Sequence, residues 1–339
     1  MEKGSIVLTL ENIGMLKKAQ VDIGGLSVIA GANDEGKSTV GKALMALIKA
    51  NHSRSNKEHS KRFDFFANLI FQYQIAGKGK IGLKINSQES CHAEIADNRC
   101  IKFNTVNCQF VDCTLIQTPL IWDLYDFFFN LTNIESNSDY TLDDFKIPYP
   151  YILKDLYAKL VGEKNFPIDK KIQQIAKDIE NIICGDFVQK RGSYVFRKKI
   201  DFEKKKTIDI LLANTATGIK NFGILQALIK NHCVTPRGFF IFDEPENHLH
   251  ATWQVKFAEI LARLVQNHVC IMVNTHSPYM LEALHKYGKK YAINTNFYLA
   301  DSGKVEQIDN DNSATLEKIY KKLNQSFISL DEILDEEEE

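Results

Sequence analysis

The sequence lacks any uninterrupted apolar run near the roughly 18–20 residues that cross a bilayer. Its opening, MEKGSIVLTLENIG, also lacks the long apolar core of a signal peptide. The absence of both features argues against an integral membrane protein and against a secreted one. We therefore expect a cytoplasmic protein that makes no membrane contact.

Cysteine pairs with metal-ligand spacing are also missing. The seven cysteines are odd in number and none forms a CxxC pair, which argues against a zinc ribbon and against a disulfide framework. No sustained heptad pattern and no internal repeat occurs, which excludes an extended coiled coil. The composition is otherwise that of an ordinary globular protein.

Charge is unevenly distributed along the chain. The net charge is −1, but the stretch DEILDEEEE at residues 331–339 is almost entirely acidic, so the rest of the chain has a net positive charge. That basic part could contact a polyanion weakly, and the acidic stretch could compete for the same surface or bind a basic partner. The alternative is a solvated tail on an ordinary body. In both cases we expect residues 326–339 to form an acidic, disordered tail.

The first part of the chain shows mainly strand patterns. Residues 5–14 alternate and end in a turn signal, and residues 19–25 and 26–31 suggest a hairpin that leads into a buried strand. Residues 79–117 again indicate β-structure. Between these segments the apolar spacing becomes helical, at Val40, Leu44, Leu47 and Ile48.

The remainder mixes helices and strands. Helical patterns occur near residues 121–131 and 170–184, and residues 193–202 predict a strand that returns towards the core. From residue 238 the two patterns alternate, with strands at 238–244, 269–276 and 291–300 and helices at 247–266 and 277–287. Apolar strands that alternate with helices predict a parallel sheet covered on both faces.

The stretch GANDEGKST, residues 31–39, lies between a predicted strand and a predicted helix and has the G-x-x-x-x-G-K-[ST] spacing of a phosphate-binding loop. Gly31 and Gly36 permit positive φ and close backbone approach, so that N–H groups can point at phosphate oxygens. Lys37 would reach the β- and γ-phosphates, and the Ser38 hydroxyl would complete a Mg²⁺ shell. The candidate nucleotide contacts are Gly31, Ala32, Asn33, Asp34, Glu35, Gly36, Lys37, Ser38 and Thr39.

An acidic element on a second strand would complete such a site. The run FFIFDE ends in Asp243 and Glu244, and paired acids at the end of an apolar strand are costly to bury without a cation. Asp243 would support Mg²⁺, and Glu244 could accept a proton from an attacking water. We expect the nearby His248 and His250 to be interface or capping residues, because their spacing is not that of zinc ligands.

Two further stretches point to one subclass of phosphate-loop protein. NTATGIKNFG, residues 214–223, opens a second helix whose N-terminus suits an anion. A nucleotide that is bound by its own phosphate loop needs no second phosphate-binding helix in the same chain. The second helix therefore implies ATP sandwiched between two copies of the chain. NTHSP, residues 274–278, places His276 at a strand end, where it could bond a γ-phosphate oxygen. The alternative is a buried histidine with an internal partner.

These motifs together resemble those of ABC-type ATPases of the SMC/RecF/OLD branch, which include stand-alone bacterial ATPases. GANDEGKST resembles their Walker A motif, TATGIKNFG their signature, IFDEPENHLH their Walker B motif and D-loop, and NTHSP their switch histidine. The resemblance implies an α/β P-loop NTPase fold with a mostly parallel sheet covered by helices, an N-terminal antiparallel β subdomain and a helical lobe. The corresponding parts are residues 1–117, the lobe at 118–209, and the second half of the domain at 210–325.

The resemblance also assigns roles to single residues. Glu244 is the implied catalytic base, with Lys37 and His276 as the other catalytic groups. Thr217 and Gly218 would contact the γ-phosphate bound by a partner subunit. Mg²⁺ would be held by Ser38, Asp243 and Gln117, of which Gln117 is a candidate because it follows a predicted strand.

The signature departs from the family pattern, because the sequence T-G-I-K has Ile219 in place of a second glycine and Lys220 in place of an acidic or amide residue. This departure puts the rate of hydrolysis in question. DEPE, by contrast, agrees with the pattern.

Three functions remain open at this stage. The first is a homodimeric or larger ATP-hydrolysing switch that senses nucleic acid or a phage product and controls a separate nuclease or toxin. This hypothesis follows the resemblance to sensor subunits of phage-defence pairs of the Septu, PARIS and retron-associated type. The second is a RecF-like repair ATPase that binds DNA through residues 51–62 and 188–206. The third is a scaffold that binds ATP without hydrolysing it. In each case ATP and Mg²⁺ are the expected cofactors.

Overall fold

The computed structural model describes residues 5–52, 59–72, 74–105, 108–137, 150–162, 169–190, 192–201 and 206–324. Within these residues, eleven strands form one mixed sheet with the order β6-β5-β4-β1-β2-β14-β13-β3-β12-β11-β7. The predicted acidic tail and part of the basic stretch at 51–62 lie outside the described residues. None of the described helices is both long and apolar enough to cross a membrane.

One end of the sheet is parallel. It consists of β3 (Leu26–Ala30), β7 (Asp112–Ile116), β11 (Gly238–Asp243), β12 (Cys270–Thr275) and β13 (Thr295–Asp301). All residues of β3, β11 and β12 are buried, as expected for strands that are covered on both faces. The register aligns the carboxyl ends of these strands along one edge.

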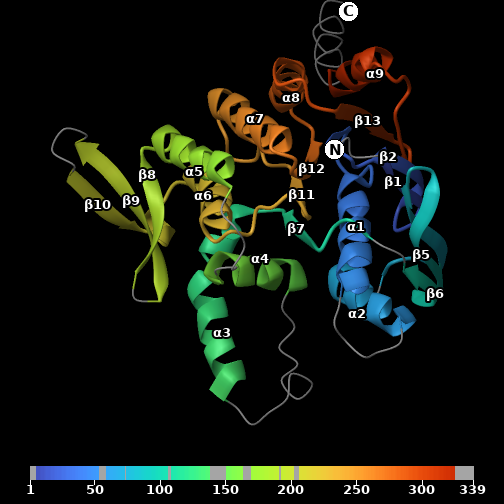
Figure 1. Ribbon diagram of the computed structural model, residues 1–339, viewed down its shortest axis with the longest axis horizontal. Helices are drawn as coiled ribbons and strands as arrows, with labels where there is room; N and C mark the ends of the chain where they lie inside the picture. Colours follow the sequence, from blue (N-terminus) through green and yellow to red (C-terminus); the bar gives the residue numbers. More distant parts are fainter. Residues whose placement is uncertain are drawn as a thin grey trace, which may run out of the picture.

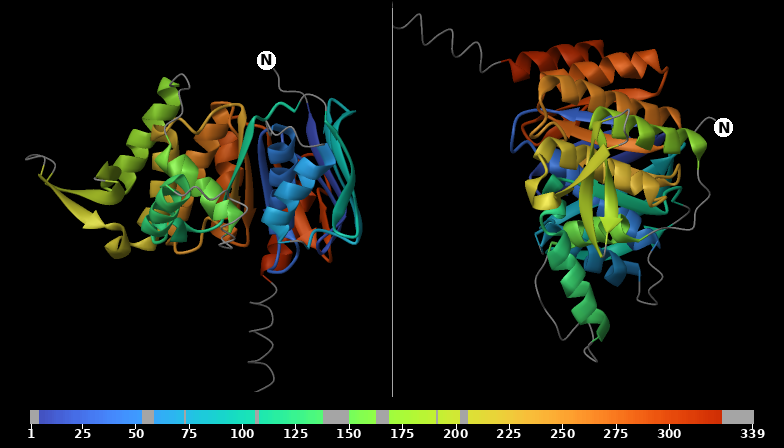
Figure 2. Two further views of the ribbon diagram at one scale, coloured as in Figure 1. Left: turned by 90° about the horizontal axis from the view of Figure 1, so that it is seen from below. Right: turned by 90° about the vertical axis from the view of Figure 1, so that its left-hand side faces the viewer.

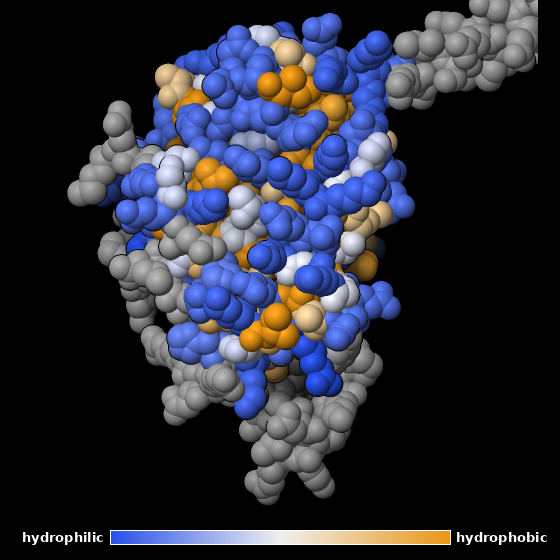
Figure 3. Space-filling model, turned by 90° about the vertical axis from the view of Figure 1, so that its right-hand side faces the viewer, coloured by the Kyte–Doolittle hydropathy of each residue, from blue (hydrophilic) through white to orange (hydrophobic). Residues whose placement is uncertain are grey.

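An antiparallel half continues the same sheet. It contains β1 (Ile6–Ile13), β2 (Leu16–Asp22), β4 (Lys78–Ile85), β5 (Gln88–Ala96) and β6 (Arg99–Thr105), and β14 (Lys304–Glu306) joins it to β13. Its strands alternate between buried and more exposed residues. The outward face is largely hydrophilic, with apolar side chains in scattered small groups (Figure 3).

Two layers of helices cover the sheet (Figures 1 and 2). On one side α1 (Lys37–His52) and α2 (His59–Phe71) share a core with the antiparallel strands and with the Phe239 and Ile241 face of β11. The opposite face, with Phe240 and Phe242, packs against α6 (Thr217–Lys230), α7 (Ala251–Gln266) and α8 (Pro278–Lys290). The last described helix, α9 (Ser313–Leu323), lies against β13.

The lobe between the two halves is helical and also contains a small sheet. It begins with η1 (Pro119–Trp122), α3 (Tyr125–Asn137), α4 (Tyr151–Val161) and α5 (Lys170–Ile182). A separate antiparallel sheet follows, formed by β8 (Gly185–Lys190), β9 (Ser193–Asp201) and β10 (Lys206–Leu211). It extends away from the body, and η2 (Leu212–Asn214) leads from it into α6 (Figure 1).

The predicted α/β fold class is confirmed, and three local predictions are corrected. The strand predicted at 193–202 exists as β9 but pairs within the lobe and not with the main sheet. The helix predicted from residue 247 begins at Ala251, because His248 has φ +66° and His250 caps the helix. The strand predicted from residue 291 begins at Thr295, because Tyr291 ends α8 and Ala292 has a positive φ.

Close packing between α6 and β8 gives a first test. A Cβ added at Gly223 would overlap the ring of Phe187, whereas one added at Gly77 would meet nothing within 4 Å. We expect Gly223→Ala to destabilise the fold by about 1–3 kcal/mol, even though alanine favours a helix. Thermal unfolding of the two variants measures this, with Gly77→Ala as the control. Equal melting temperatures for both would contradict the packing described.

Candidate nucleotide-binding site

Residues 31–36 form a tight loop between β3 and α1. Gly36 has φ +83° and Asp34 has φ +65°, so two left-handed residues turn the backbone before the helix. Gly31 does not adopt the positive φ that the sequence suggested, and its lack of a side chain has another cause. A Cβ there would overlap the carbonyl oxygen of Ala300 in β13, so Gly31 permits close backbone approach only.

Lys37 is the first residue of α1, and its side chain folds back over the loop. Its Nζ donates hydrogen bonds to the carbonyl oxygens of Gly31 at 3.0 Å and Ala32 at 2.7 Å, and lies 3.8 Å from Oε1 of Glu244. Burial lowers the pKa of Lys37 below its usual range, although the carboxylates of Glu244 and Asp243 oppose this effect. The ammonium group is therefore placed between the loop and the acids of β11.

Asp243 ends β11, and three donors from other elements converge on its carboxylate. Ser38 Oγ donates to Oδ1 at 3.0 Å, Asn274 Nδ2 donates to Oδ1 at 2.8 Å, and Gln117 Nε2 donates to Oδ2 at 3.2 Å. The structure thus places Gln117 beside Asp243, where the sequence predicted it. Asn274 is an additional member of the cluster that the sequence argument did not include.

The donor set fits a magnesium nucleotide. Mg²⁺ takes oxygen ligands and is usually held by one or two protein groups together with phosphates and water. Ser38 Oγ, Asp243 and the Gln117 amide supply such oxygens, and the buried Oδ1 of Asn274 has no hydrogen-bond partner. Within the described residues, no group of three or more His, Cys, Asp or Glu side chains could hold a metal alone.

Glu244 follows Asp243 in a strained backbone conformation with φ +52°. Its N–H bonds to the carbonyl of Asn274 at 2.9 Å, and its Oε2 accepts from Asn247 Nδ2 at 3.2 Å. Oε1 lies 3.3 Å from Nδ1 of His276, which follows β12. Strain of this kind is typical of functional sites. The Glu244 carboxylate lies beside Lys37 and His276.

A second acid, Glu246, lies behind the histidine and was missed by the sequence argument. It is 4% exposed, and its Oε1 accepts hydrogen bonds from Thr275 Oγ1 and from the backbone N–H groups of His276 and Ser277. The sequence did contain one signal for this residue. It is a charged residue two positions after the pair Asp243 and Glu244, in a stretch without lysine or arginine.

The signature-like residues do not lie beside Asp243 but at the start of another helix, α6 (Thr217–Lys230). Thr217 and Gly218 begin α6, which packs on the opposite face of the sheet from α1. A Cβ on Gly218 would lie 3.1 Å from the carbonyl oxygen of His248, and Asn221 donates to the carbonyl of Asn247 at 3.0 Å. The start of α6 therefore contacts the loop after β11.

Lys220, the unusual residue of the signature, points into the lobe. Its side chain is 5% exposed, and its Nζ lies 2.5 Å from Oδ1 of Asp123. The indole N–H of Trp122 donates to its carbonyl oxygen at 3.0 Å. The lysine is thus an anchor between α6 and the lobe, which explains how a basic residue is accommodated there.

His250 caps α7 as expected, because its Nδ1 accepts from the N–H of Thr252. His248, one turn earlier, is exposed. Among the predicted site residues the structure brings together Lys37, Ser38, Gln117, Asp243, Glu244 and His276 at the carboxyl edge of the parallel strands. Ligands bind at this edge in open α/β sheets.

A family model described as "AAA domain, putative AbiEii toxin, Type IV TA system" matches residues 161–282. This segment contains the signature-like helix, Asp243 and His276, and it does not include the P-loop. A search of curated proteins found no significant match. The family match thus covers the part of the chain that contains Asp243 and His276.

Solved structures with a similar fold include SMC heads and an ABC cassette. The SMC head domain from Thermotoga maritima has 13% identity and a TM-score of 0.47, covering 91% of this chain and 99% of its own. The Smc head from Pyrococcus furiosus, bound to the C-terminal domain of ScpA, has 14% identity and a TM-score of 0.49, covering 93% and 99%. An ATP-binding cassette of an ABC transporter in its ADP conformation has 12% identity and a TM-score of 0.41, covering 93% and 98%.

The position of Asp243 predicts a metal-dependent effect on binding. We expect Asp243→Asn to weaken binding of Mg²⁺-ATP by about tenfold or more, since loss of a group that orients the metal typically costs that much. Binding of ATP in EDTA should change much less. Titration of a fluorescent ATP analogue measures both affinities.

Asp97→Asn is the matched control. Asp97 is exposed in the turn between β5 and β6, and asparagine also tolerates its left-handed backbone. If Asp97→Asn weakened Mg²⁺-dependent binding as much as Asp243→Asn, a general loss of negative charge would explain the result. Asp243 would then have no specific place in the metal site.

Proposed function

We propose that the chain is an ATP-binding and hydrolysing switch that acts as a homodimer or larger homo-oligomer and controls a separate effector protein. The observation that carries the proposal is the convergence of five side chains at one sheet edge. Ser38 and Gln117 both donate hydrogen bonds to Asp243, and Glu244 follows Asp243 and lies beside His276. This set contains a metal site, a base and a phosphate-sensing group.

In the proposed reaction each side chain has one task. Lys37 and the loop N–H groups hold the β- and γ-phosphates, and Mg²⁺, when bound, neutralises charge on the same oxygens. Glu244 orients the attacking water and accepts its proton. His276 donates to a γ-phosphate oxygen and so distinguishes ATP from ADP. Loss of that oxygen on hydrolysis would release the contacts around it.

Dimer formation is proposed because α6 supplies a second anion-binding helix start, on the opposite face of the sheet from α1. Thr217 and Gly218 begin a helix whose N-terminus has no side-chain cap, so its N–H groups can donate hydrogen bonds to an external phosphate. In an ATP sandwich these residues would meet the γ-phosphate on the P-loop of the second copy. Each site would then contain residues from two chains.

The biological role is proposed from the family resemblance. The description of the matched family includes the words "putative AbiEii toxin, Type IV TA system". This description supports the proposal of a role in antiviral defence. In such a role the ATPase would sense nucleic acid or a phage product and act on a nuclease or toxin. The dimer, opened and closed by ATP, would be the element that transmits the signal.

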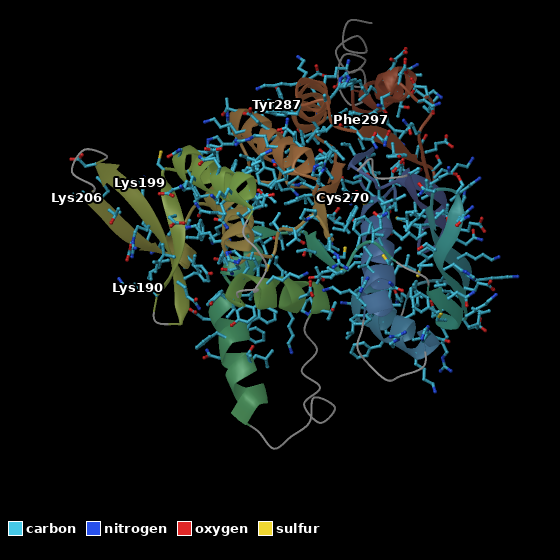
Figure 4. All side chains as sticks on the ribbon, in the orientation of Figure 1. Lys190, Lys199, Lys206, Cys270, Tyr287 and Phe297 are labelled. Atoms are coloured by element: carbon cyan, nitrogen blue, oxygen red, sulfur yellow. The ribbon has the colours of Figure 1, made fainter. Side chains whose placement is uncertain are left out.

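A DNA-repair function through a basic surface has weaker support. Lys190 and Arg197 on the lobe sheet share the carboxylate of Asp209, and Lys199 pairs with Glu180. Figure 4 shows Lys190, Lys199 and Lys206 distributed along this sheet. Among the described residues of this sheet, Lys190, Arg197 and Lys199 are therefore paired with acids of the same chain, which leaves these three charges less free to contact phosphates. A non-hydrolysing scaffold remains the alternative that the altered signature favours.

Mixing two inactive variants tests the shared site. Lys37→Ala removes the loop lysine, and Thr217→Glu places a negative charge opposite the γ-phosphate without harming the start of a helix. Each variant alone should release little phosphate. An equimolar mixture should regain roughly a quarter of the wild-type rate, since half of the dimers are mixed and each holds one intact site of two.

Phosphate release, measured for each variant and for their mixture, decides between the arrangements. A mixture as inactive as its components, with mixed dimers confirmed by native mass spectrometry, would contradict a site shared between chains. Full activity of Thr217→Glu alone would remove the start of α6 from the site.

A further inference from the structure

Glu246 is a buried acid with an unusual set of partners. Its Oε1 accepts three hydrogen bonds, from Thr275 Oγ1 at 2.6 Å, His276 N at 2.9 Å and Ser277 N at 3.2 Å. The donors are the last residue of β12, Thr275, and the two residues that lead from it into α8. One oxygen of Glu246 therefore fixes the backbone on which His276 is carried.

Three polar atoms near this point are buried without a hydrogen-bond partner. They are Oε2 of Glu246, Oδ1 of Asn274 and Nδ1 of His276. Buried polar atoms normally find partners, so the concentration of unpaired atoms at one place indicates a functional cluster. His276 Nδ1 lies 3.5 Å from Glu246 Oε1 and 3.3 Å from Glu244 Oε1. The imidazole thus faces two carboxylates.

A second set of bonds ties the same segment to the loop after β11. Ser277 Oγ donates to Gln254 Oε1 at 2.6 Å, and Gln254 Nε2 donates to the carbonyl of Leu249 at 2.9 Å. Ser277 Oγ also accepts from the N–H of Met280 and so caps α8. The histidine segment, α7 and the loop that contains Glu244 are therefore linked through side chains.

We propose that Glu246 is a positioning residue that holds the His276 imidazole against Glu244 by anchoring residues 275–277 and by placing a carboxylate beside Nδ1. The proposal rests on the proposed ATPase function, because it concerns the histidine that would contact the γ-phosphate. With Nδ1 held towards the two carboxylates, Nε2 is the ring nitrogen left to face the nucleotide. Glu246 itself would touch neither ATP nor water.

Anchoring alone would not require an acid at this position. A glutamine would keep an acceptor oxygen with two lone pairs at this place, and it would avoid burying a charge. A carboxylate is explained if its charge acts on the imidazole. This difference separates positioning of the histidine from simple capping of a loop.

Glu246→Gln tests that difference, because it keeps the acceptor oxygen and removes the charge. We expect the variant to melt close to the wild-type temperature and to bind ATP with unchanged affinity. Its kcat should fall roughly tenfold or more, since small displacements of a reacting group can cost up to about a hundredfold. Thr275→Val is the matched control, because it removes a donor to Glu246 and leaves every charge in place. We expect Thr275→Val to lower the melting temperature and to lower kcat much less than Glu246→Gln does.

A double-variant comparison shows whether Glu246 acts through the histidine. If it does, Glu246→Gln combined with His276→Ala should be no slower than His276→Ala alone. If kcat of the double variant falls by the product of the two single-variant factors, the two residues act independently and the proposal is overturned. The proposal would also be overturned if Glu246→Gln and Thr275→Val lowered the melting temperature equally and had the same kcat. Glu246 would then be only a structural anchor.

A measurement without ATP separates this proposal from the proposed function. Imidazole nitrogen signals of His276, assigned by their loss in His276→Ala, should move in Glu246→Gln more than those of the other eight histidines. They should stay in place in Thr275→Val. Unmoved signals in Glu246→Gln would overturn the proposal even if the protein hydrolyses ATP. If the signals move while wild type releases no phosphate, the ATPase function fails and the positioning role stands.

Discussion

The carboxylate of Asp243 is the point at which four parts of the fold meet. It ends β11 and accepts hydrogen bonds from Ser38 at the start of α1, Gln117 after β7 and Asn274 in β12. Each donor stands at the carboxyl end of a neighbouring strand or at the helix that follows one. A buried acid is costly without such partners, so the parallel register and the site depend on each other.

The same constraint explains the distribution of small and strained residues around the site. Gly31 is needed where β3 passes the backbone of Ala300, and Gly36 is needed for the turn that begins α1. Glu244 takes a positive φ immediately after the strand. The surrounding strands, buried on both faces, hold these conformations in place. The bonds from Glu246 and Gln254 extend this rigid frame to the helices α7 and α8.

Much of the fold and the core of the site could be predicted from the sequence, for identifiable reasons. Strand–helix alternation after residue 238 fixed the parallel strands, and the spacing of GANDEGKST and FFIFDE located Lys37, Ser38, Asp243 and Glu244. Gln117 and His276 were placed because each follows an apolar strand, and parallel strands end at a common edge. The partners Asn274 and Glu246 lie inside the motifs NTHSP and DEPE but were given no role, because the sequence does not show which side chains they meet in the fold.

The lobe was harder to predict, because only β9 of its small sheet was recognised as a strand and its pairing with β8 and β10 is a tertiary feature. The salt bridge from Lys220 to Asp123 joins residues far apart in the chain, so the reason for a lysine in the signature became visible only in three dimensions. Helix boundaries such as Ala251 depended on a left-handed residue, which composition alone does not identify. These are tertiary effects that override local preference.

The central claim is that ATP joins two chains at a site whose base is Glu244. Light scattering during size-exclusion chromatography, together with phosphate release, tests it most directly for wild type and Glu244→Gln in Mg²⁺-ATP. The account predicts that Glu244→Gln abolishes release and accumulates as an ATP-bound dimer or larger assembly, because binding is kept and hydrolysis is lost. A wild-type protein that hydrolyses ATP as a monomer, with Glu244→Gln changing neither rate nor size, would contradict it.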